Sequence, residues 1–388
     1  MLFENLMSVE DAKRKLLERI EPFDSGDVET LSIENAHMRI LAGDVASGID
    51  IPHYNRAAMD GFAVRHAEVK QAGRTNPVLL EKGKNAVWVH TGDPLPEGFD
   101  AVVKVEDTEE IEGFVAVYKA VRKHENVGLR GEDVRKGDVI AERGTLLRAH
   151  SIALLRSAGV ESVEVLRRPR VLVVPTGDEL LKPGERLVEG KVYESNGIMI
   201  AAYLREWGAD AEVADIVRDE VSQLEKIFEN SGDYDMVVTT GGTSVGKRDL
   251  IYDVLDALGD VVFRGVALRP GKPTLFATVN DTPVLALPGF PAACVASAYV
   301  FLKPAIQKML GFNEEVSFFA SISDNIYSKA GFTSFVRLRV DFGRMVAQPV
   351  SSHGSGILSS ITKANCYTII DENTEVVERG ESVRVFPL

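Results

Sequence analysis

The chain has 388 residues and a mass of 42.4 kDa, more than one hydrophobic core usually serves, so about two to four domains are expected. Its 44 basic and 58 acidic residues give a net charge of −14, which argues against nucleic acid as a partner but leaves room for one small anion. Two cysteines, no secretory signal pattern and no apolar run long enough to span a bilayer argue against a disulfide framework, a zinc ribbon and a membrane partner, and predict a cytoplasmic protein.

Helical patterns stand at the N-terminus and again after about residue 136. Ser8 followed three residues later by Asp11 resembles a capping box, and apolar residues then recur at helical spacing as far as Ile20. Further helices are predicted over SIENAHMRILA, residues 32–42, and HSIALLRSAGV, residues 150–160. We therefore expect residues 1–47 and 137–168 to form one discontinuous helical domain.

The stretch between these segments, residues 48–136, has the texture of an all-β insert. Short alternating apolar runs such as NAVWVHTG and GFVAVYKAV are separated there by Gly, Pro and Asp. Several strands are therefore expected, with turns between them, and no long helix.

From Arg170 onward, strands alternate with helices. Uninterrupted apolar strands such as RVLVVPTG and YDMVVTTGG predict a parallel sheet covered by helices on both faces over residues 169–311. AACVASAYVFL, near the end of that stretch, predicts a buried helix, and residues 312–388 predict a second small β domain. The expected fold class is multidomain α/β plus β.

The segment VVTTGGTSVGKRD, residues 237–249, places Gly241, Gly246 and Lys247 at the spacing of a phosphate-binding P-loop. A P-loop requires Ser or Thr at the next position, because that hydroxyl holds Mg²⁺, whereas this chain has Arg248. The loop is therefore expected to hold a phosphate through backbone amides, not as a P-loop.

Four polar loops are expected to meet beyond the carboxyl ends of the parallel strands, where such sheets bind ligands. They are PTGDEL at 175–180, RDE at 218–220, TTGGTSVGKRD at 239–249 and LPGFP at 287–291. Gly177, Gly241, Gly242 and Gly289 allow the backbone to approach a ligand closely.

Three carboxylates on these loops, Glu179, Asp219 and Asp249, would suit Mg²⁺, which prefers oxygen ligands and bridges to phosphates. The alternative for each residue is a helix cap, with Asp178 in place of Glu179 as the other candidate for the first cap. The occurrence of all three at strand ends favours a site.

The remaining candidates are weaker. Arg269 and Lys272 in ALRPGKPT, residues 267–274, form a rigid basic turn that either clamps an anion or is only a solvated turn. AAMDGFAV at 57–64 and HTGDPLPEGFDAVVKVED at 90–107 could each be turns between strands. Histidine spacing indicates no metal site, and Cys294, in an apolar helix, reads as core.

Seven strings in series resemble the MoeA family of molybdenum cofactor biosynthesis, the molybdopterin molybdenumtransferases, over nearly the whole chain: AAMDGFAV, HTGDPLPEGFDAVV, LRGEDVRKGD, PTGDEL, VVTTGGTSVGKRD, LRPGKPT and LALPGFPAA. The resemblance implies a four-domain homodimer whose α/β domain is similar to molybdopterin adenylyltransferases and whose C-terminal domain is a β barrel. It also implies Mg²⁺-assisted insertion of molybdate, or tungstate, into adenylylated molybdopterin with release of AMP. Molybdopterin adenylyltransferase and acceptor apoenzymes are the protein partners it suggests.

The resemblance also assigns roles to residues. It makes Asp60, Thr91 and Asp133 catalytic residues of the insert, facing the α/β domain of the partner subunit across the dimer interface, where Glu179, Asp219 and Asp249 complete the catalytic set and hold the metal. Asp60 or Asp249 could instead transfer protons. The expected substrate-binding residues are Gly177, Gly241, Gly242, Ser244, Arg269, Lys272, Pro288, Pro291 and Ser355.

The chain departs from the family at four positions. Arg269 replaces a frequent Lys, Gly265 replaces another, and Phe290 and Ala293 replace an Asn and a Ser in the L-P-G-x-P turn. The changes to Phe290 and Ala293 remove polar contacts that relatives have at this turn. Two alternative functions stay open: adenylyl transfer to molybdopterin, and a dimeric scaffold without turnover.

Overall fold

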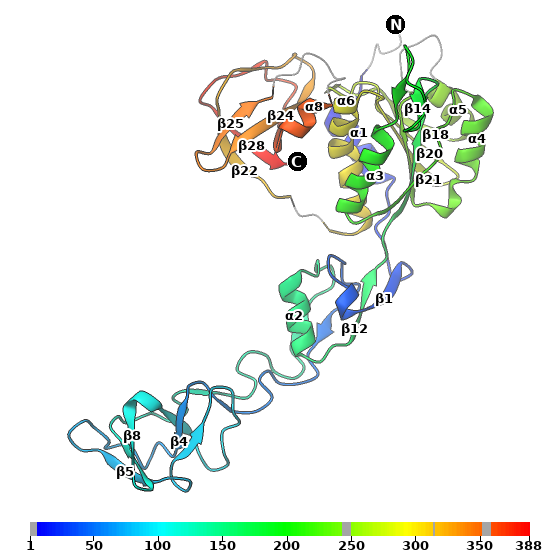
Figure 1. Cartoon of the computed structure of the whole chain (residues 1–388). Coiled ribbons are helices and arrows are strands. Elements are labelled where there is room, and N and C mark those ends of the chain that lie inside the picture. The colour runs from blue at the N-terminus through cyan, green and yellow to red at the C-terminus, as the bar shows by residue number, and fades with distance from the viewer. Residues whose placement is uncertain (1–5, 243–249, 313–314, 351–357) are drawn as a thin grey trace. The chain divides into compact units, whose positions relative to one another are not determined.

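The computed structural model describes residues 6–242, 250–312, 315–350 and 358–388 (Figure 1). Its contacts divide the chain into two compact units. The insert unit is Val28–Val165, and the main unit combines Met1–Asp27 with Leu166–Leu388. The first helix therefore groups with the α/β part, whereas the sequence placed it with residues 137–168; the four domain boundaries stay predictions.

A six-stranded sheet forms the centre of the main unit, in the order β16-β13-β17-β21-β20-β18. The first four strands run parallel, as predicted, whereas β20 runs antiparallel to both of its neighbours, β21 and β18, which the sequence did not indicate. The strands are β16 (Asp210–Val213), β13 (Arg170–Pro175), β17 (Met236–Thr240), β21 (Thr282–Leu287), β20 (Leu275–Val279) and β18 (Asp260–Arg264). Both β17 and β21 are buried along their whole length, which is why they read as unbroken apolar runs.

Helices cover both faces of this sheet (Figure 1). On one face, α4 (Val221–Glu229) and α5 (Leu250–Leu258) bury Leu224, Phe228 and Leu255 against the strands. On the other lie α1 (Val9–Glu18), α3 (Asn196–Glu206) and the predicted buried helix, which is continuous through α6 (Pro291–Ser297), η4 (Ala298–Leu302) and α7 (Lys303–Met309). The doubly covered α/β sheet expected from the sequence is confirmed.

The first helix begins as the sequence predicted. Ser8 is the N-cap of α1, and its hydroxyl oxygen accepts a hydrogen bond from the Asp11 N–H at 3.1 Å. Leu16 is fully buried on its inner face.

Arg167 ties the N-terminal segment to the sheet. Its guanidinium donates to both carboxylate oxygens of Asp235 at 2.6 and 2.7 Å and to Asp27 at 2.9 Å, and lies over the Phe23 ring. The side chain is one-third exposed. These charge-assisted contacts hold residues 20–27 against the strand ends.

Because the substitution removes these hydrogen bonds and leaves two acidic partners, Arg167→Met should lower the free energy of unfolding by about 1–3 kcal/mol. Urea titration followed by circular dichroism measures this. Arg14→Met is the matched control, because Arg14 pairs with Asp11 and Glu18 on the exposed face of α1 and its substitution should change the free energy of unfolding far less. Equal effects of the two substitutions would contradict the assignment.

The C-terminal strands close into the predicted β barrel. The sheet order is β19-β24-β25-β22-β28-β26, and a further pairing of β24 with β26 completes the ring. Its strands are β22 (Phe318–Ile322), β24 (Thr333–Asp341), β25 (Val346–Pro349), β26 (Cys366–Ile370) and β28 (Ser382–Pro387); β19 (Leu268–Arg269) joins β24 from the side. Two short strands, β23 (Ile326–Tyr327) and β27 (Val376–Val377), pair separately, and α8 (Ser359–Lys363) lies beside β24.

The insert unit has two parts. Short strand pairs, β1 (Val28–Ser32) with β12 (Ser162–Leu166) and β2 (Val45–Ala46) with β11 (Val139–Ala141), enclose one core together with α2 (Ala149–Ser157). The second part is all β, as predicted. Its two sheets are β6-β4-β7 and β5-β9-β8, and β3 (Arg56–Ala57) pairs with β10 (Val127–Gly128). The sheet strands are β4 (Gly61–Val64), β5 (Val78–Glu81), β6 (Val87–Val89), β7 (Ala101–Lys104), β8 (Thr108–Ile111) and β9 (Phe114–Val117).

The helix predicted over residues 32–42 is wrong. Only a 3-10 turn forms, η1 (Ile33–Asn35), and it is followed by a turn at residues 37–38 and by isolated β-bridges at Ile40 and Leu41. The Met38 N–H donates to the Leu147 carbonyl and the Leu41 N–H to the Thr145 carbonyl, so these backbone groups are used by a segment about 100 residues later. Pairing with distant chain therefore overrides a locally helical pattern.

Candidate functional site

The loops that follow β13, β17 and β21 meet at the carboxyl edge of the sheet. The Gly177 N–H donates to the Val217 carbonyl at 3.1 Å, and the Gly241 N–H donates to the Leu287 carbonyl at 3.1 Å. Asn196, the first residue of α3, donates from its side-chain amide to the Gly289 carbonyl at 2.6 Å. The convergence of these loops, expected from the sequence, is therefore present in the structure.

Glycine is needed where two of these loops cross. Gly241 has φ 107°, and a Cβ there would lie 2.5 Å from the Thr176 carbonyl oxygen. Gly289 packs against it, since its own Cβ would be 3.4 Å from the Gly241 Cα. Backbone rather than side chains therefore lines this part of the edge, which suits close approach of a ligand.

Acidic side chains gather beside this crossing. The Asp219 N–H donates to the Asp178 carboxylate at 3.3 Å, and the Glu179 carboxylate lies over Gly177. Desolvation, together with the negative charges of Asp178 and Glu179, raises the pKa of the Asp219 carboxyl above its usual range. Arg218 holds the segment by donating to the carbonyls of Asp178 and Leu180 at 2.9 and 3.0 Å.

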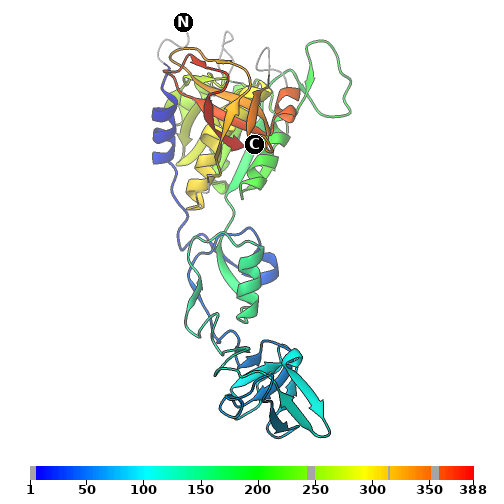
Figure 2. The ribbon, with the colours of Figure 1, turned by 90° about the vertical axis from the view of Figure 1, so that its left-hand side faces the viewer.

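Helix capping does not explain these acids. The chain after Glu179 continues into β14 (Leu180–Leu181), which pairs with β15 (Val192–Tyr193), so no helix begins there. The loop between these two strands extends away from the α/β part in Figure 2. Helix α4 has Glu220 at its N-cap and no side-chain capping bond, so Asp219 does not cap it either. The capping alternative is wrong for Asp178, Glu179 and Asp219.

The donor set fits magnesium in kind. Mg²⁺ is usually held by one or two carboxylates together with waters and substrate phosphates, and Glu179 and Asp219 supply two carboxylates at one edge. Within the described ranges, no group of three or more His, Cys, Asp or Glu side chains forms a metal site by itself. The raised pKa of Asp219 indicates that a cation would relieve the clustering of negative charge.

Asp219→Asn should raise the thermal midpoint at pH 7. A carboxyl whose pKa is higher in the folded state costs stability once the pH exceeds the unfolded value near 3.8, and this cost fades as the pH falls back toward that value. Differential scanning fluorimetry at pH 7 and pH 4.5 should therefore show a gain that shrinks at the lower pH.

Asp215→Asn is the matched control for this experiment. Lys182 lowers the pKa of Asp215, so its substitution should not stabilise the protein at pH 7. A gain for both variants, or for neither, would contradict the electrostatic account of Asp219.

Unpartnered polar atoms are buried at the same edge. Among the described residues, the hydroxyls of Thr176, Thr239 and Thr240 and the side-chain amide oxygen of Asn196 have no hydrogen-bond partner. Thr176 and Thr240 are each only 2% exposed. Buried polar atoms are rarely left unsatisfied, so such a cluster indicates a place where a ligand or ordered water binds.

The other main-unit candidates are placed as follows. Pro288 is buried, and Pro291 is the first residue of α6. Arg269 and Lys272 are exposed on a turn whose Gly271 carbonyl accepts from Thr274 at 2.7 Å. Of the departures, Phe290 is 64% exposed at the turn, whereas Ala293 is 4% exposed inside α6 and Gly265 is buried. Ser244, Asp249 and Ser355 lie outside the described residues.

The insert unit brings Asp60 and Thr91 together. The Thr91 N–H donates to the Asp60 carboxylate at 2.6 Å, and hydrogen bonds from the backbone and side chain of Thr91 lower the pKa of Asp60. Asp133 is exposed, and its N–H donates to the Ile51 carbonyl at 3.1 Å. Asp60 is thus held as an anion, while Asp133 is placed without a described contact to that pair.

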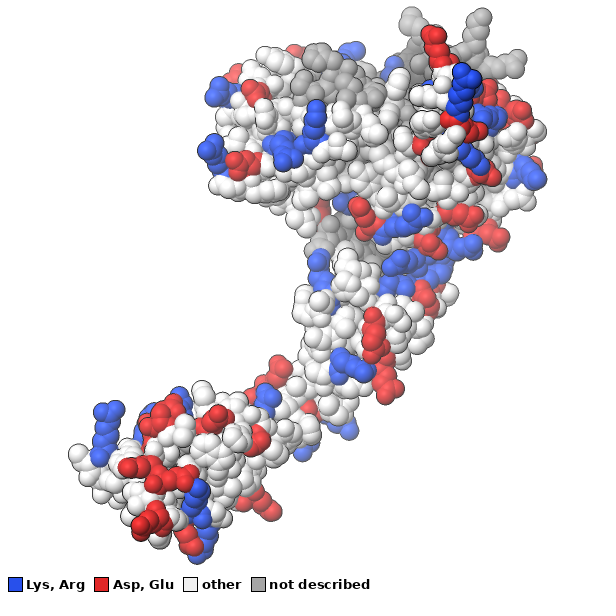
Figure 3. All heavy atoms as spheres, in the orientation of Figure 1, with Lys and Arg blue, Asp and Glu red and all other residues white. Residues whose placement is uncertain are grey.

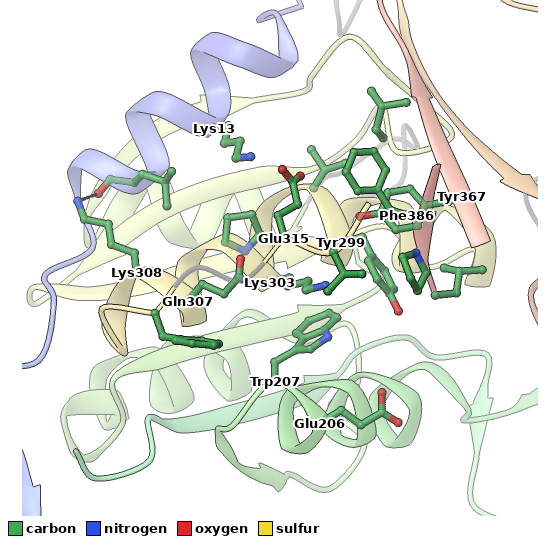
Figure 4. Close-up of a pocket in the computed structure, with 18 of the residues that line it drawn as sticks. Lys13, Glu206, Trp207, Tyr299, Lys303, Gln307, Lys308, Glu315, Tyr367 and Phe386 are labelled. Carbon is green, nitrogen blue, oxygen red and sulfur yellow. Dashed lines mark hydrogen bonds between the residues drawn. The ribbon is translucent and has the colours of Figure 1, made fainter. Parts of the chain in front are cut away.

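A separate cavity of about 940 Å³ lies at the C-terminal end of α3 and along α7 (Figure 4). Its wall includes the aromatic rings of Trp207, Tyr299, Tyr367 and Phe386, and burial lowers the pKa of Lys303 beside them. Helix α3 starts with Asn196 at the carboxyl edge of the sheet, the strand-end site. The helix has 11 residues, so its C-terminal end, at the cavity, lies about 16 Å from that site. None of the site residues predicted from the sequence lines this cavity.

Several residues of the site were missed by the sequence reasoning. Asn196 contacts a residue 93 positions away, and Thr176 was read only as part of PTGDEL. Arg218 was seen as part of RDE without a role. Polar residues at strand ends and helix starts were the available signal, but their partners are set by tertiary contacts.

Surface charge and hydropathy add little to the choice of ligand. Acidic and basic side chains are interspersed over the face seen in Figure 3. In the part of the chain that the structure describes, none of the helices has the length and apolar character of a bilayer-crossing segment.

Comparison with known families accounts for most of the chain. Residues 7–159 match the MoeA N-terminal region (domain I and II), residues 172–308 match a probable molybdopterin binding domain, and residues 320–388 match the MoeA C-terminal region (domain IV). The first match takes in α1 and most of the insert unit, the second the α/β sheet and its helices, and the third the barrel.

Whole-chain relatives agree with these matches. The chain is 32% identical to the molybdopterin molybdenumtransferase of Haemophilus influenzae, covering 98% of each chain, and 34% identical to that of Bacillus subtilis, covering 93% of this chain and 90% of the relative. Among solved structures, the molybdopterin biosynthesis moeA protein of Pyrococcus horikoshii OT3 is similar with a TM-score of 0.86 at 29% identity, covering 99% of this chain and all of that one.

Proposed function

The chain belongs to the MoeA family and is a molybdopterin molybdenumtransferase of molybdenum cofactor biosynthesis, and we propose that it inserts molybdate or tungstate into adenylylated molybdopterin with release of AMP, with Mg²⁺ as cofactor. The observation that carries the proposal is the edge where the glycine crossing, the unpartnered hydroxyls and the carboxylates of Glu179 and Asp219 meet. That edge offers donors and acceptors for a phosphate and a metal ion in one place.

The residues of the strand-end site have different roles because their surroundings differ. The Gly241 and Gly289 crossing gives backbone access to the phosphoanhydride, while Thr176 and Thr240 offer hydroxyls that water or ligand must satisfy. Glu179 and Asp219 would hold Mg²⁺, which when bound would neutralise the phosphoanhydride charge as AMP departs. Asp219, with its raised pKa, is also the better proton acceptor of the two predicted acids whose pKa is shifted.

Asp60 has a complementary role. Its lowered pKa and its hydrogen bond from Thr91 keep it ionised, so it can accept hydrogen bonds from a substrate but is a weak base. We place Asp60 and Thr91 of one subunit against the strand-end site of the partner subunit in a homodimer. Basic side chains Arg269 and Lys272, exposed on their turn, are suited to an oxyanion.

The proposal is tested by AMP release from adenylylated molybdopterin with Mg²⁺, comparing molybdate, tungstate and no oxyanion. We expect release that depends on the oxyanion and on Mg²⁺, with mature cofactor formed. Consumption of ATP with free molybdopterin, and no such release, would favour an adenylyltransferase. If neither AMP release nor ATP consumption is observed, and the protein retains stoichiometric protein partners in a pulldown, a scaffold would be favoured.

A further inference from the structure

Two aromatic residues that the resemblance does not assign stand beside Asp60 in the insert unit. Trp88 lies on the edge strand β6, and His90 follows two residues later. The Trp88 indole N–H donates to the His90 Nε2 at 3.2 Å, and the His90 Nδ1 is 4.0 Å from an Asp60 carboxylate oxygen. The three side chains therefore form a row that ends at the residue held by Thr91.

The direction of these contacts fixes the state of His90. Because the indole nitrogen can only donate, Nε2 of His90 must accept and carries no proton. The proton of the neutral ring is then on Nδ1, the nitrogen that faces the Asp60 carboxylate. His90 therefore links the orientation of the indole to the position of the Asp60 carboxylate.

The row is open to solvent on one side and anchored on the other. Trp88 is 38% exposed, and the side chains of His90 and Asp60 are 66% and 55% exposed. Phe62, which is 1% exposed, packs edge to face with Trp88 at 5.1 Å between ring centroids. An exposed indole that is held by a buried ring and a hydrogen bond is suited to contact a flat ligand without losing much side-chain freedom.

We propose that Trp88 is a substrate-contact residue whose indole stacks on a flat heteroaromatic ring of the substrate, with His90 as the residue that positions it beside Asp60. The inference rests on the proposed function, which places Asp60 and Thr91 at the substrate. Two rings of adenylylated molybdopterin share the required chemistry, the pterin and the adenine. Stacking on an aromatic side chain is tolerant of ring type, so the experiment must distinguish them.

The chain has two tryptophans, Trp88 and Trp207, so ¹⁹F NMR of protein labelled with 5-fluorotryptophan should give two resonances. Trp88→Phe and Trp207→Phe assign them. Pterin and AMP are titrated separately into the full-length protein. We expect the Trp88 resonance to shift saturably with one of the two compounds, which identifies the ring, while the Trp207 resonance serves as the internal reference. A Trp88 resonance that moves with neither compound would overturn the inference.

Kinetics give a second readout. Trp88→Ala should raise the KM for adenylylated molybdopterin by about tenfold, and Trp88→Phe should keep most of the affinity because a ring face remains. A far-ultraviolet circular dichroism spectrum and a thermal midpoint like those of the wild type show that Trp88→Ala is folded. Wild-type KM in Trp88→Ala would count against stacking.

His90 is tested through the same signal. His90→Ala should move the Trp88 resonance in the free protein and weaken the ring-induced shift, whereas His90→Gln, which keeps an acceptor for the indole N–H, should restore both in part. Identical behaviour of the two variants would contradict the positioning role.

The failures of the two proposals are distinguishable. If the wild-type protein releases AMP but Trp88 is silent in both experiments, only the stacking inference fails. If no AMP is released, the proposed function fails whatever the ¹⁹F titration shows.

Discussion

Asp219→Asn should reduce Mg²⁺- and oxyanion-dependent AMP release by about 10²- to 10³-fold, as expected for loss of one group that stabilises charge in the transition state. The carboxylate lies at the strand-end edge beside Asp178 and Glu179, and its pKa is raised by desolvation and by these two charges. Asparagine keeps the shape but cannot hold a cation or take up a proton. The loss should appear mainly in kcat, because the substrate still meets the glycine crossing.

The matched control for this loss is Asp215→Asn. Asp215 precedes Asp219 by four residues, but its side chain is 88% exposed and pairs with Lys182. Its substitution should leave AMP release within about twofold of wild type, since surface pairs away from a site contribute little. If Asp219→Asn were as active as Asp215→Asn, neither a metal ligand nor a proton acceptor could be assigned to Asp219.

Asp219→Asn should stabilise the fold while it reduces the activity. A carboxylate crowded by Asp178 and Glu179 costs stability in the folded state, so its retention indicates a role other than folding. A rise in thermal midpoint together with a fall in turnover is therefore the combined signature of a functional Asp219. A structural acid would lose both or neither.

Much of the main unit could be predicted from the sequence because its strands are buried on both faces. A fully buried parallel strand such as β17 must be apolar throughout, and the position of its loop at the carboxyl edge then follows from topology. Convergence of the loops at Gly177, Gly241 and Gly289 was foreseeable for that reason. The sequence did not show which polar atoms would be left there without a hydrogen-bond partner.

The failures have a common cause in contacts between distant residues. Residues 32–42 have a helical pattern, yet Met38 and Leu41 give their N–H groups to Leu147 and Thr145. The Asn196 amide finds Gly289, and Arg167 finds Asp27 and Asp235. No local pattern encodes such pairs, so the sequence does not show that α1 packs beside α7 or that Asn196 belongs to the site.

Mixing Asp60→Asn with Asp219→Asn should restore activity that neither variant has alone. Asp60 belongs to the insert unit and Asp219 to the main unit. If each site combines the insert of one subunit with the main unit of the partner subunit, a mixed dimer has one site with both acids intact and one with both replaced. After complete reassortment, about a quarter of the wild-type AMP release should return. Gel filtration with light scattering checks that the species is a dimer.

The double variant Asp60→Asn/Asp219→Asn, mixed with wild type, separates shared sites from sites built within one subunit. In shared sites every mixed dimer is inactive, so about a quarter of the activity should remain after equal mixing, whereas sites within one subunit would leave about half. The shared site would be contradicted if the mixed single variants recovered no activity and the double-variant mixture kept about half of the wild-type activity. Because both mixtures contain the same total protein and the same substitutions, their difference depends only on which chain supplies Asp60 to each Asp219.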